Sequence, residues 1–111
     1  MKNRLDRSKF FLGTYILQPY ARTEAHIRDL ADAGIDVVMC MQSDYKALDL
    51  FAKYGVGAIV NDVLPGWWGG DGDRAGTMHK VNTWDKYEAG AAKFVDHPAI
   101  VGIDTGDEPS A

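Results

Sequence analysis

The chain of 111 residues has few of the features that staple a small protein or hold it in a membrane. It contains one cysteine, Cys40, so no disulfide can form within the chain. Because Cys40 stands inside an apolar run, we expect it to be a small buried hydrophobic side chain. The longest apolar stretch, residues 10–17, is far too short to cross a bilayer. It is also too short for the apolar segment of a signal peptide. The sequence therefore indicates no membrane attachment and leaves the compartment open.

Clustered positive charge is also missing. Twelve Lys and Arg residues against 16 Asp and Glu residues give a formal net charge of −4, and no basic run stands out. Phosphate binding needs a clustered cationic surface, so we expect no nucleic-acid partner. Hydrophobic residues make up 46% and charged residues 25% of the chain, which is typical of a globular domain and not of a disordered segment.

The chain does contain a regular series of apolar runs. They are predicted to be buried strands because they are rich in apolar residues and lack the polar alternation of a half-exposed strand. The four runs are residues 10–16, 35–41, 56–62 and 99–105.

Helix signals lie between these runs. Thr23, Ser43 and Thr83 are predicted to cap three helices, and Gly34 and Gly55 are predicted to end the first two. The inner face of the third helix is predicted to carry Trp84, Tyr87, Ala91, Phe94 and Val95.

The resulting order, βαβαβαβ, predicts an α/β fold with four parallel strands joined by helical crossovers. The third unit is longer because residues 63–82 form an inserted loop. That loop leaves the carboxyl end of a strand, where ligands bind in parallel folds. Four parallel strands alone leave two unpaired edges and an uncovered apolar face. We therefore expect the chain to be part of a larger barrel or to pair with another half. A small open doubly wound sheet is the structural alternative.

The end of the sequence carries the most specific motif. His97 and Pro98 precede the fourth apolar run, and Asp107, Glu108 and Pro109 follow it. This pattern resembles the fourth-strand motif of the large clan of retaining TIM-barrel glycoside hydrolases, which includes β-galactosidase-like, cellulase-like and agarase-like enzymes. In that clan the motif marks the acid/base glutamate, so the resemblance implies that Glu108 is the general acid/base.

The same resemblance implies an architecture. Residues 1–111 would be the N-terminal half of a TIM-barrel catalytic domain. In a partial (β/α)8 barrel they would supply the first four parallel strands with three helices. A full barrel needs eight strands and about 250 residues, so the chain is expected to be a fragment of a longer protein.

The chemistry explains why a glutamate belongs at this position. Glycosidic cleavage needs a carboxylic acid that is still protonated near neutral pH, and a neighbouring anion such as Asp107 favours the protonated form. The resemblance also places Asp107 among the substrate-binding residues. Many clan members have Asn there, which hydrogen-bonds the sugar 2-hydroxyl, whereas an ionised Asp107 accepts hydrogen bonds and donates none. Alternatively, the two acids form a polar turn that caps a helix N-terminus.

The ends of the second and third strands supply further candidates for sugar binding. Trp67 and Trp68 are adjacent in a glycine-rich loop, and flat indole faces stack on sugar rings. Asn61 and Asp62 precede this loop, and Gln42 follows the second strand. We expect these polar groups to hydrogen-bond sugar hydroxyls. For the tryptophans, an aromatic plug that covers the mouth of the barrel is the alternative.

Together these residues predict a retaining glycoside hydrolase that acts on a β-linked oligosaccharide or polysaccharide, with no metal and no other cofactor. In the resembling clan the nucleophile is a carboxylate of the seventh strand, which this sequence does not contain, so we expect the chain to be inactive alone. The expected partners are the sugar and the remainder of the barrel, or a second copy that associates through the open sheet edges.

Two other functions fit the same residues. A metal-dependent TIM-barrel aldolase or lyase would use Asp104, Asp107 and Glu108 around a divalent cation, which accepts oxygen ligands of this kind. A non-catalytic sugar-binding remnant would bind oligosaccharide through Trp67 and Trp68 without hydrolysis.

Overall fold

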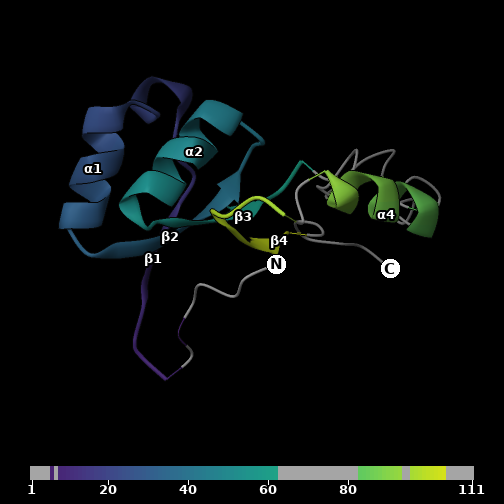
Figure 1. The fold of residues 1–111 in the computed structure, drawn as a ribbon, viewed down its shortest axis with the longest axis horizontal. Coiled ribbons are helices and arrows are strands. Elements are labelled where there is room, and N and C mark those ends of the chain that lie inside the picture. Colours follow the sequence, from purple (N-terminus) through teal and green to yellow (C-terminus); the bar gives the residue numbers. More distant parts are fainter. Residues whose placement is uncertain (1–5, 7, 63–82, 94–95, 105–111) are drawn as a thin grey trace, which may run out of the picture.

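The computed structural model describes residues 6, 8–62, 83–93 and 96–104 and shows an α/β fold built on a four-stranded parallel sheet (Figure 1). The strands are β1 (Leu12–Tyr15), β2 (Ile35–Met41), β3 (Gly57–Val60) and β4 (Ile100–Ile103). The described helices are α1 (Glu24–Asp32), α2 (Tyr45–Tyr54) and α4 (Trp84–Ala92), and a short 3-10 turn, η1 (Pro19–Ala21), precedes α1. The predicted class, with its parallel strands and three helices, is confirmed. β2 has the predicted bounds, and the other strands are shorter than predicted.

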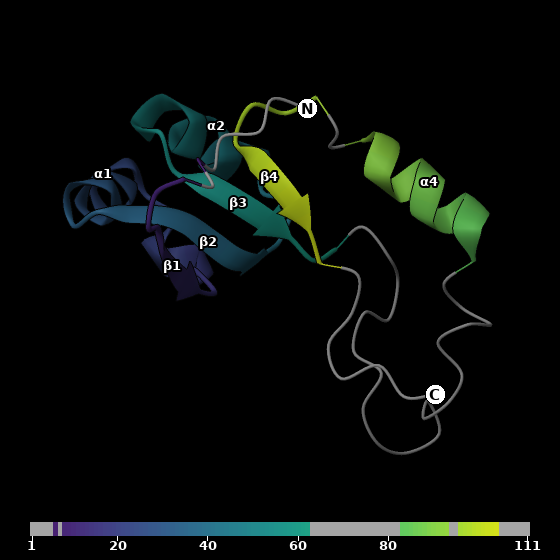
Figure 2. The same cartoon turned by 90° about the horizontal axis from the view of Figure 1, so that it is seen from below.

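The strands follow one another across the sheet in the order β1-β2-β3-β4, and each neighbouring pair is parallel. Both α1 and α2 lie on the same face of this sheet (Figures 1 and 2). A doubly wound sheet reverses its strand order at a switch point. The described strands contain no such reversal, so they do not have the order of the doubly wound alternative.

The core lies between the sheet and the layer formed by α1 and α2. Ile27 of α1 and Leu48 and Phe51 of α2 are fully buried. They belong to one cluster with strand and strand-flanking side chains of the sheet: Val38, Met41, Val56, Ala58, Val60, Ala99 and Ile100. Burial of one large apolar side chain stabilises a protein by about 1.5–3 kcal/mol. This packing therefore holds both helices on the sheet and fixes the positions of the strand ends.

Local sequence signals set several helix ends. Thr23 caps α1 as predicted, because its hydroxyl accepts a hydrogen bond from the backbone N–H of His26. Gly55 ends α2 with a φ of 74°, a left-handed conformation that glycine adopts without strain. Thr83 occupies the predicted cap position of α4, without a capping hydrogen bond from its side chain.

The prediction that Ser43 caps α2 was wrong. Asp44 takes this position, and its carboxylate accepts a hydrogen bond from the backbone N–H of Ala47 at 3.3 Å. Serine and aspartate cap helices about equally well. The hydroxyl of Ser43 instead donates to Asp62, which belongs to the neighbouring strand end.

The predicted inner face of α4 was also partly wrong. Tyr87 and Ala91 pack against the core, but Trp84 is 72% exposed and stacks on Tyr87 with ring centroids 5.5 Å apart. Figure 2 shows α4 reaching beyond the sheet, so its first turn has no sheet surface to cover. The remaining two residues of that predicted face lie outside the described residues: Phe94 and Val95.

The sheet face opposite α1 and α2 is not covered by any described helix (Figure 2). Successive side chains of a strand point to opposite faces, and the buried Val38 is followed by Met39, which is 39% exposed. Tyr15, the register partner of Met39 on β1, is exposed as well. Parallel sheets normally have both faces covered. This second face is therefore an apolar surface that suits further packing.

Candidate functional site

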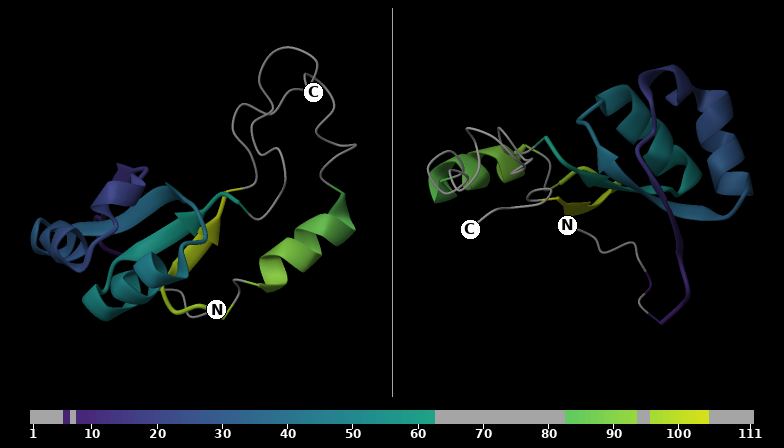
Figure 3. Two further views of the ribbon diagram at one scale, coloured as in Figure 1. Left: turned by 90° about the horizontal axis from the view of Figure 1, so that it is seen from above. Right: turned by 180° about the vertical axis from the view of Figure 1, so that it is seen from behind.

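A cleft of about 320 Å³ lies where the carboxyl ends of the first three strands meet. Figure 3 shows the arrowheads of β3 (teal) and β4 (yellow) pointing to the same edge of the sheet. The cleft is lined by residues at or after the ends of β1, β2 and β3: Ile16, Gln18, Pro19, Arg22, Cys40, Gln42, Asn61 and Asp62. The structure thus brings together Gln42, Asn61 and Asp62, three of the predicted substrate-binding residues.

Arg22 is the one cation among the described residues that line this cleft, and its guanidinium is occupied by protein partners. Its Nε donates to the carbonyl of Leu17 at 2.9 Å, and a terminal nitrogen donates to Gln42 Oε1 at 3.2 Å. Another terminal nitrogen lies 3.5 Å from the Asp44 carboxylate, and 9% of the Arg22 side chain is exposed. Arg22 therefore ties the end of β1 to the residues after β2. Sequence reasoning missed this role because nothing local distinguishes it from a solvent-exposed arginine before a helix cap.

Asn61 has a buried side chain with an unused polar atom. The residue is 6% exposed, and its backbone N–H donates to the carbonyl of Met41 at 2.9 Å, which fixes it beside the end of β2. Its side-chain Oδ1 is buried and has no hydrogen-bond partner among the described residues. A buried polar atom without a partner costs about 1–3 kcal/mol. At the wall of a cleft, such an atom indicates a place where a ligand or a water molecule donates a hydrogen bond.

Asp62 follows Asn61 in the chain and is held by the loop after β2. The backbone N–H of Ser43 donates to Asp62 Oδ2 at 2.8 Å, and the Ser43 hydroxyl donates to the same oxygen. No hydrogen bond to Asp62 Oδ1 is formed within the described part of the chain. Among the described residues, Oδ1 is therefore an acceptor without a partner.

Cys40 and Asp104 connect the cleft to β4. Cys40 is buried, as predicted, and its Sγ donates to Asp104 Oδ2 at 3.5 Å. The backbone N–H of Asp104 donates to the carbonyl of Val60 at 2.8 Å, which holds the residue directly after β4 against β3. Asp104 therefore brings a carboxylate to the wall of the cleft.

Two lining residues have strained backbones. Ile16 has a φ of 52° and Cys40 a φ of 54°, in the left-handed region that residues other than glycine seldom adopt. This conformation costs about 1–2 kcal/mol per residue. The Ile16 backbone N–H still donates to the carbonyl of Met39 at 3.0 Å, so the strain does not break the pairing with β2. Strain of this kind concentrates at binding and catalytic sites, which favours a functional role for this edge of the sheet.

Among the described residues that line the cleft or contact its lining side chains, carboxylates outnumber cations. Asp62 lines it, Asp104 contacts its wall through Cys40, and Asp44 pairs with Arg22. These three carboxylates and the Arg22 guanidinium leave an excess of negative charge in the described part of the site.

No group of three or more His, Cys, Asp or Glu side chains that could hold a metal ion occurs within the described ranges. Asp104, one of the three acids of the metal-dependent alternative, thus belongs to no such group there. The other two acids, Asp107 and Glu108, lie outside the described residues.

No protein-family model, curated protein or solved structure significantly matches this chain. The resemblance carried by Asp107, Glu108 and Pro109 therefore stays a prediction. In the described part of the chain, no helix is long and apolar enough to cross a membrane.

The predicted acid/base residue and the predicted stacking residues lie outside the described residues: Glu108, Asp107, Trp67 and Trp68. Their roles stay predictions. The described part of the site is therefore the polar cleft that contains Gln42, Asn61 and Asp62.

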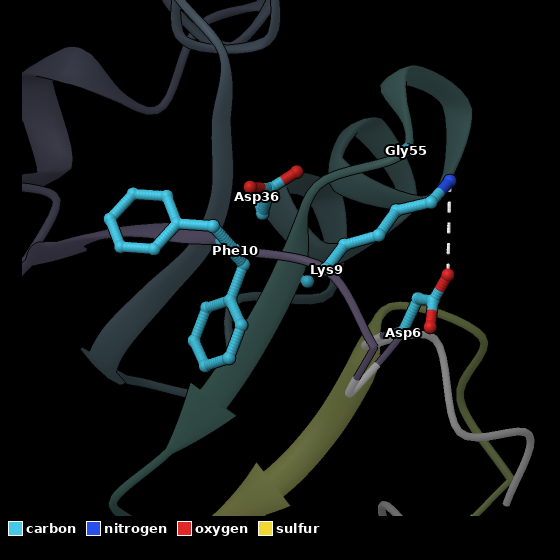
Figure 4. A pocket seen from close by; sticks show the side chains of 7 residues that line it. Asp6, Lys9, Phe10, Asp36 and Gly55 are labelled. Atoms are coloured by element: carbon cyan, nitrogen blue, oxygen red, sulfur yellow. Dashed lines mark ion pairs between the residues drawn. The ribbon is translucent and has the colours of Figure 1, made fainter.

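A second hollow, of about 230 Å³, lies at the opposite edge of the sheet, near the amino ends of β2 and β3 (Figure 4). Lys9 and Asp6 form an ion pair of 3.7 Å there, and Phe10 is 90% exposed. Asp36 accepts a hydrogen bond from the backbone N–H of Leu12 at 2.9 Å, so its carboxylate holds β1 beside β2. The contacts described at this hollow are therefore structural.

Proposed function

We propose that this chain supplies the first four βα units of a retaining TIM-barrel glycoside hydrolase. Glu108 is its general acid/base, and the cleft at the carboxyl edge holds part of the sugar. The proposal is carried by one observation: Gln42, Asn61 and Asp62 line a single cleft at the carboxyl edge of a parallel sheet. Active sites of TIM-barrel enzymes lie at this edge.

The strand order supports a barrel. In a TIM barrel, eight parallel strands follow one another in sequence order, and their helices form an outer ring. Here β1 to β4 have that order, and α1 and α2 lie on one face. The opposite face, on which Met39 and Tyr15 are exposed, would line the barrel interior. The proposal requires the rest of the barrel as a partner, which would pair with the outer edges of β1 and β4 and cover this face.

The polar groups of the cleft suit a ligand rich in hydroxyl groups. Asn61 Oδ1 and Asp62 Oδ1 are acceptors without a partner among the described residues. Gln42 accepts from Arg22 through Oε1, and its amide NH₂ forms no hydrogen bond within the described ranges. A sugar hydroxyl both donates and accepts hydrogen bonds. The cleft therefore contains acceptors for the hydrogen bonds that a sugar hydroxyl donates and a donor for those that it accepts.

Glu108 comes four residues after Asp104, whose carboxylate contacts the cleft wall through Cys40. Four residues of chain span at most about 14 Å, so the backbone of the proposed proton donor lies within about that distance of Asp104. Glu108 would transfer its proton to the glycosidic oxygen as the bond to the anomeric carbon breaks. It would then take a proton from the attacking water.

The reaction also needs a nucleophile. In a retaining enzyme this is a second carboxylate about 5 Å from the acid/base. By the resemblance it belongs to the seventh strand, outside this chain. We therefore expect no turnover by the 111 residues alone, and turnover by this chain would contradict the assignment of the nucleophile.

The test is a comparison of two glutamate substitutions in the complete gene product. Glu108→Gln removes the proposed acid with little change in size, and we expect about 10²- to 10⁴-fold slower cleavage of glycosides with poor leaving groups. Glu88→Gln, at an exposed position of α4, is the matched control and is expected to keep the wild-type rate. A wild-type rate for Glu108→Gln would rule out the proposed role of Glu108.

A further inference from the structure

The unused atom of Asn61 restricts the chemistry of the ligand. Oδ1 is a hydrogen-bond acceptor, so the group that satisfies it must donate. A hydroxyl donates a hydrogen bond, whereas an ionised carboxylate or a sulfate has only acceptors. Because Asn61 is nine-tenths buried and lines the cleft, a ligand that fills the cleft with an anionic group would leave this acceptor unsatisfied.

The charges around the cleft also disfavour an anionic ligand. Asp62 lines the cleft, and the Asp104 carboxylate contacts its wall. The charge of Arg22 is directed to Asp44, and its side chain is almost buried. Within the part of the chain that the structure describes, Asp62 therefore presents a like charge to an anionic ligand and no lining cation is directed to that ligand, and like charges in partly desolvated surroundings repel.

The size of the cleft limits how much of a sugar chain it holds. Ligand pockets for small molecules range from about 300 to 1,000 Å³, and a cleft of about 320 Å³ is at the lower end of this range. This volume suits one sugar unit.

From these three observations we infer that the cleft binds a single uncharged sugar unit through its hydroxyl groups and excludes the corresponding uronic acid. The inference rests on the proposed function and adds to it the charge and the size of the unit bound. Asn61 accepts from a sugar hydroxyl, Gln42 donates to a sugar oxygen, and Asp62 makes the cleft unfavourable for anions.

The test uses sugars that differ at one carbon. Glucose and galactose carry a CH₂OH group where glucuronate and galacturonate carry a carboxylate. The protein is titrated with each sugar, and the NMR signals of the Asn61 and Gln42 side-chain amides are followed. We expect at least one neutral sugar to bind about tenfold more tightly than its uronate. Added salt should reduce this difference in affinity, because it screens the repulsion between the uronate and Asp62.

Three substitutions test whether Asp62 and Asn61 cause this selectivity. Asp62→Asn removes a negative charge from the cleft and should raise the affinity for the uronate several-fold. Asp32→Asn, at an exposed position of α1, changes the net charge equally and should leave both affinities unchanged. Asn61→Leu removes the buried acceptor in a side chain of similar size. We expect about tenfold weaker binding of the neutral sugar, with a free energy of unfolding that stays the same or rises.

The outcomes separate the inference from the proposed function. A uronate that binds as tightly as its neutral partner overturns the inference and leaves the proposed sugar site intact. An Asn61→Leu variant that is stabilised but binds sugar with unchanged affinity also overturns it, because Oδ1 would then contact water only. If the folded protein binds neither kind of sugar, the proposed sugar site itself is wrong, and the inference fails with it.

Discussion

Ser43 donates two hydrogen bonds to one oxygen of Asp62, one from its backbone N–H at 2.8 Å and one from its hydroxyl. The two residues are separated by 19 positions in the chain, so this contact joins the loop after β2 to the residues after β3. It holds the Asp62 carboxylate at the cleft through one oxygen, Oδ2. The shape of the cleft thus depends on a contact between two loops as well as on the sheet.

Removal of the Ser43 hydroxyl should therefore lower the stability of the folded protein. We expect Ser43→Ala to lower the free energy of unfolding by about 0.5–1.5 kcal/mol, because one of the two hydrogen bonds to Asp62 is lost. Ser8→Ala is the matched control. Ser8 makes the same pair of hydrogen bonds to Asp6 but only across two residues, and we expect a change below about 0.5 kcal/mol. Urea unfolding of both variants measures the difference, and equal losses would contradict the bridging role of Ser43.

Arg22 should tolerate no conservative replacement. Its guanidinium contacts Leu17, Gln42 and Asp44 with three different nitrogens, which a lysine ammonium cannot reproduce. We expect Arg22→Lys to lower the free energy of unfolding by about 1–3 kcal/mol, because partners at an almost buried site lose their donors. The same substitution at the exposed Arg28 of α1 is the control. If both substitutions have the same small effect in urea unfolding, the role assigned to Arg22 is wrong.

The strain at Ile16 predicts a stabilising substitution. Asparagine adopts left-handed backbone conformations far more readily than a β-branched residue. Ile16 is 37% exposed, so its replacement also loses part of its apolar burial. We expect relief of the strain to exceed this loss, so that Ile16→Asn raises the free energy of unfolding by up to about 0.5 kcal/mol, and Ile16→Val, which keeps the strain, gives no gain. A loss of stability in the asparagine variant, seen as a lower thermal midpoint, would show that the strain has been overestimated.

An ion pair between α1 and α2 predicts a dependence of stability on pH. The Glu24 carboxylate accepts hydrogen bonds from Lys53 and from the Tyr54 hydroxyl, and these bonds, that of Lys53 first, lower the pKa of Glu24 below its ordinary value of 4.5. A lowered pKa in the folded state means that this stabilisation is present above pH 4.5 and is lost as the pH falls through the folded value.

Unfolding in urea at several pH values between 7 and 3 should therefore show that the wild type and Glu24→Gln differ near neutral pH and converge in acid. Both groups are exposed to solvent, so we expect a small difference that high salt reduces. The exposed Glu88→Gln serves as the control. A constant difference between the wild type and Glu24→Gln across this range would contradict the coupling.

Much of the fold follows from local patterns that the sequence shows directly. The apolar runs predicted the four strands, and Thr23 and Gly55 predicted helix ends correctly, because capping and left-handed glycine are properties of a few neighbouring residues. Ser43 and Asp44 are both good helix caps and adjacent in sequence. Ser43 bonds to Asp62, 19 positions further along the chain, while Asp44 caps the helix, and no local pattern distinguishes the two roles.

The candidate site was predictable where it follows from topology. Gln42, Asn61 and Asp62 were expected at one edge of the sheet because parallel strands bring their carboxyl ends together, and the structure places them in one cleft. Arg22 and Cys40 were not predicted to line this cleft, and Asp104 was named only as a ligand in the metal-dependent alternative. Their positions depend on side-chain contacts between distant segments and on backbone strain, and neither leaves a pattern in the sequence.

If Glu108 gives a proton to the departing sugar oxygen, the loss of its carboxyl group changes how the rate depends on the leaving group. The measurement is kcat/KM for a series of aryl β-glycosides whose phenols differ in acidity, with the complete gene product and with its Glu108→Gln variant. Good leaving groups need little protonation, so we expect a shallow dependence for the wild type and a steep one for the variant, with the rates converging for the most acidic phenols. The same slope in both proteins would contradict the role of Glu108 as the acid.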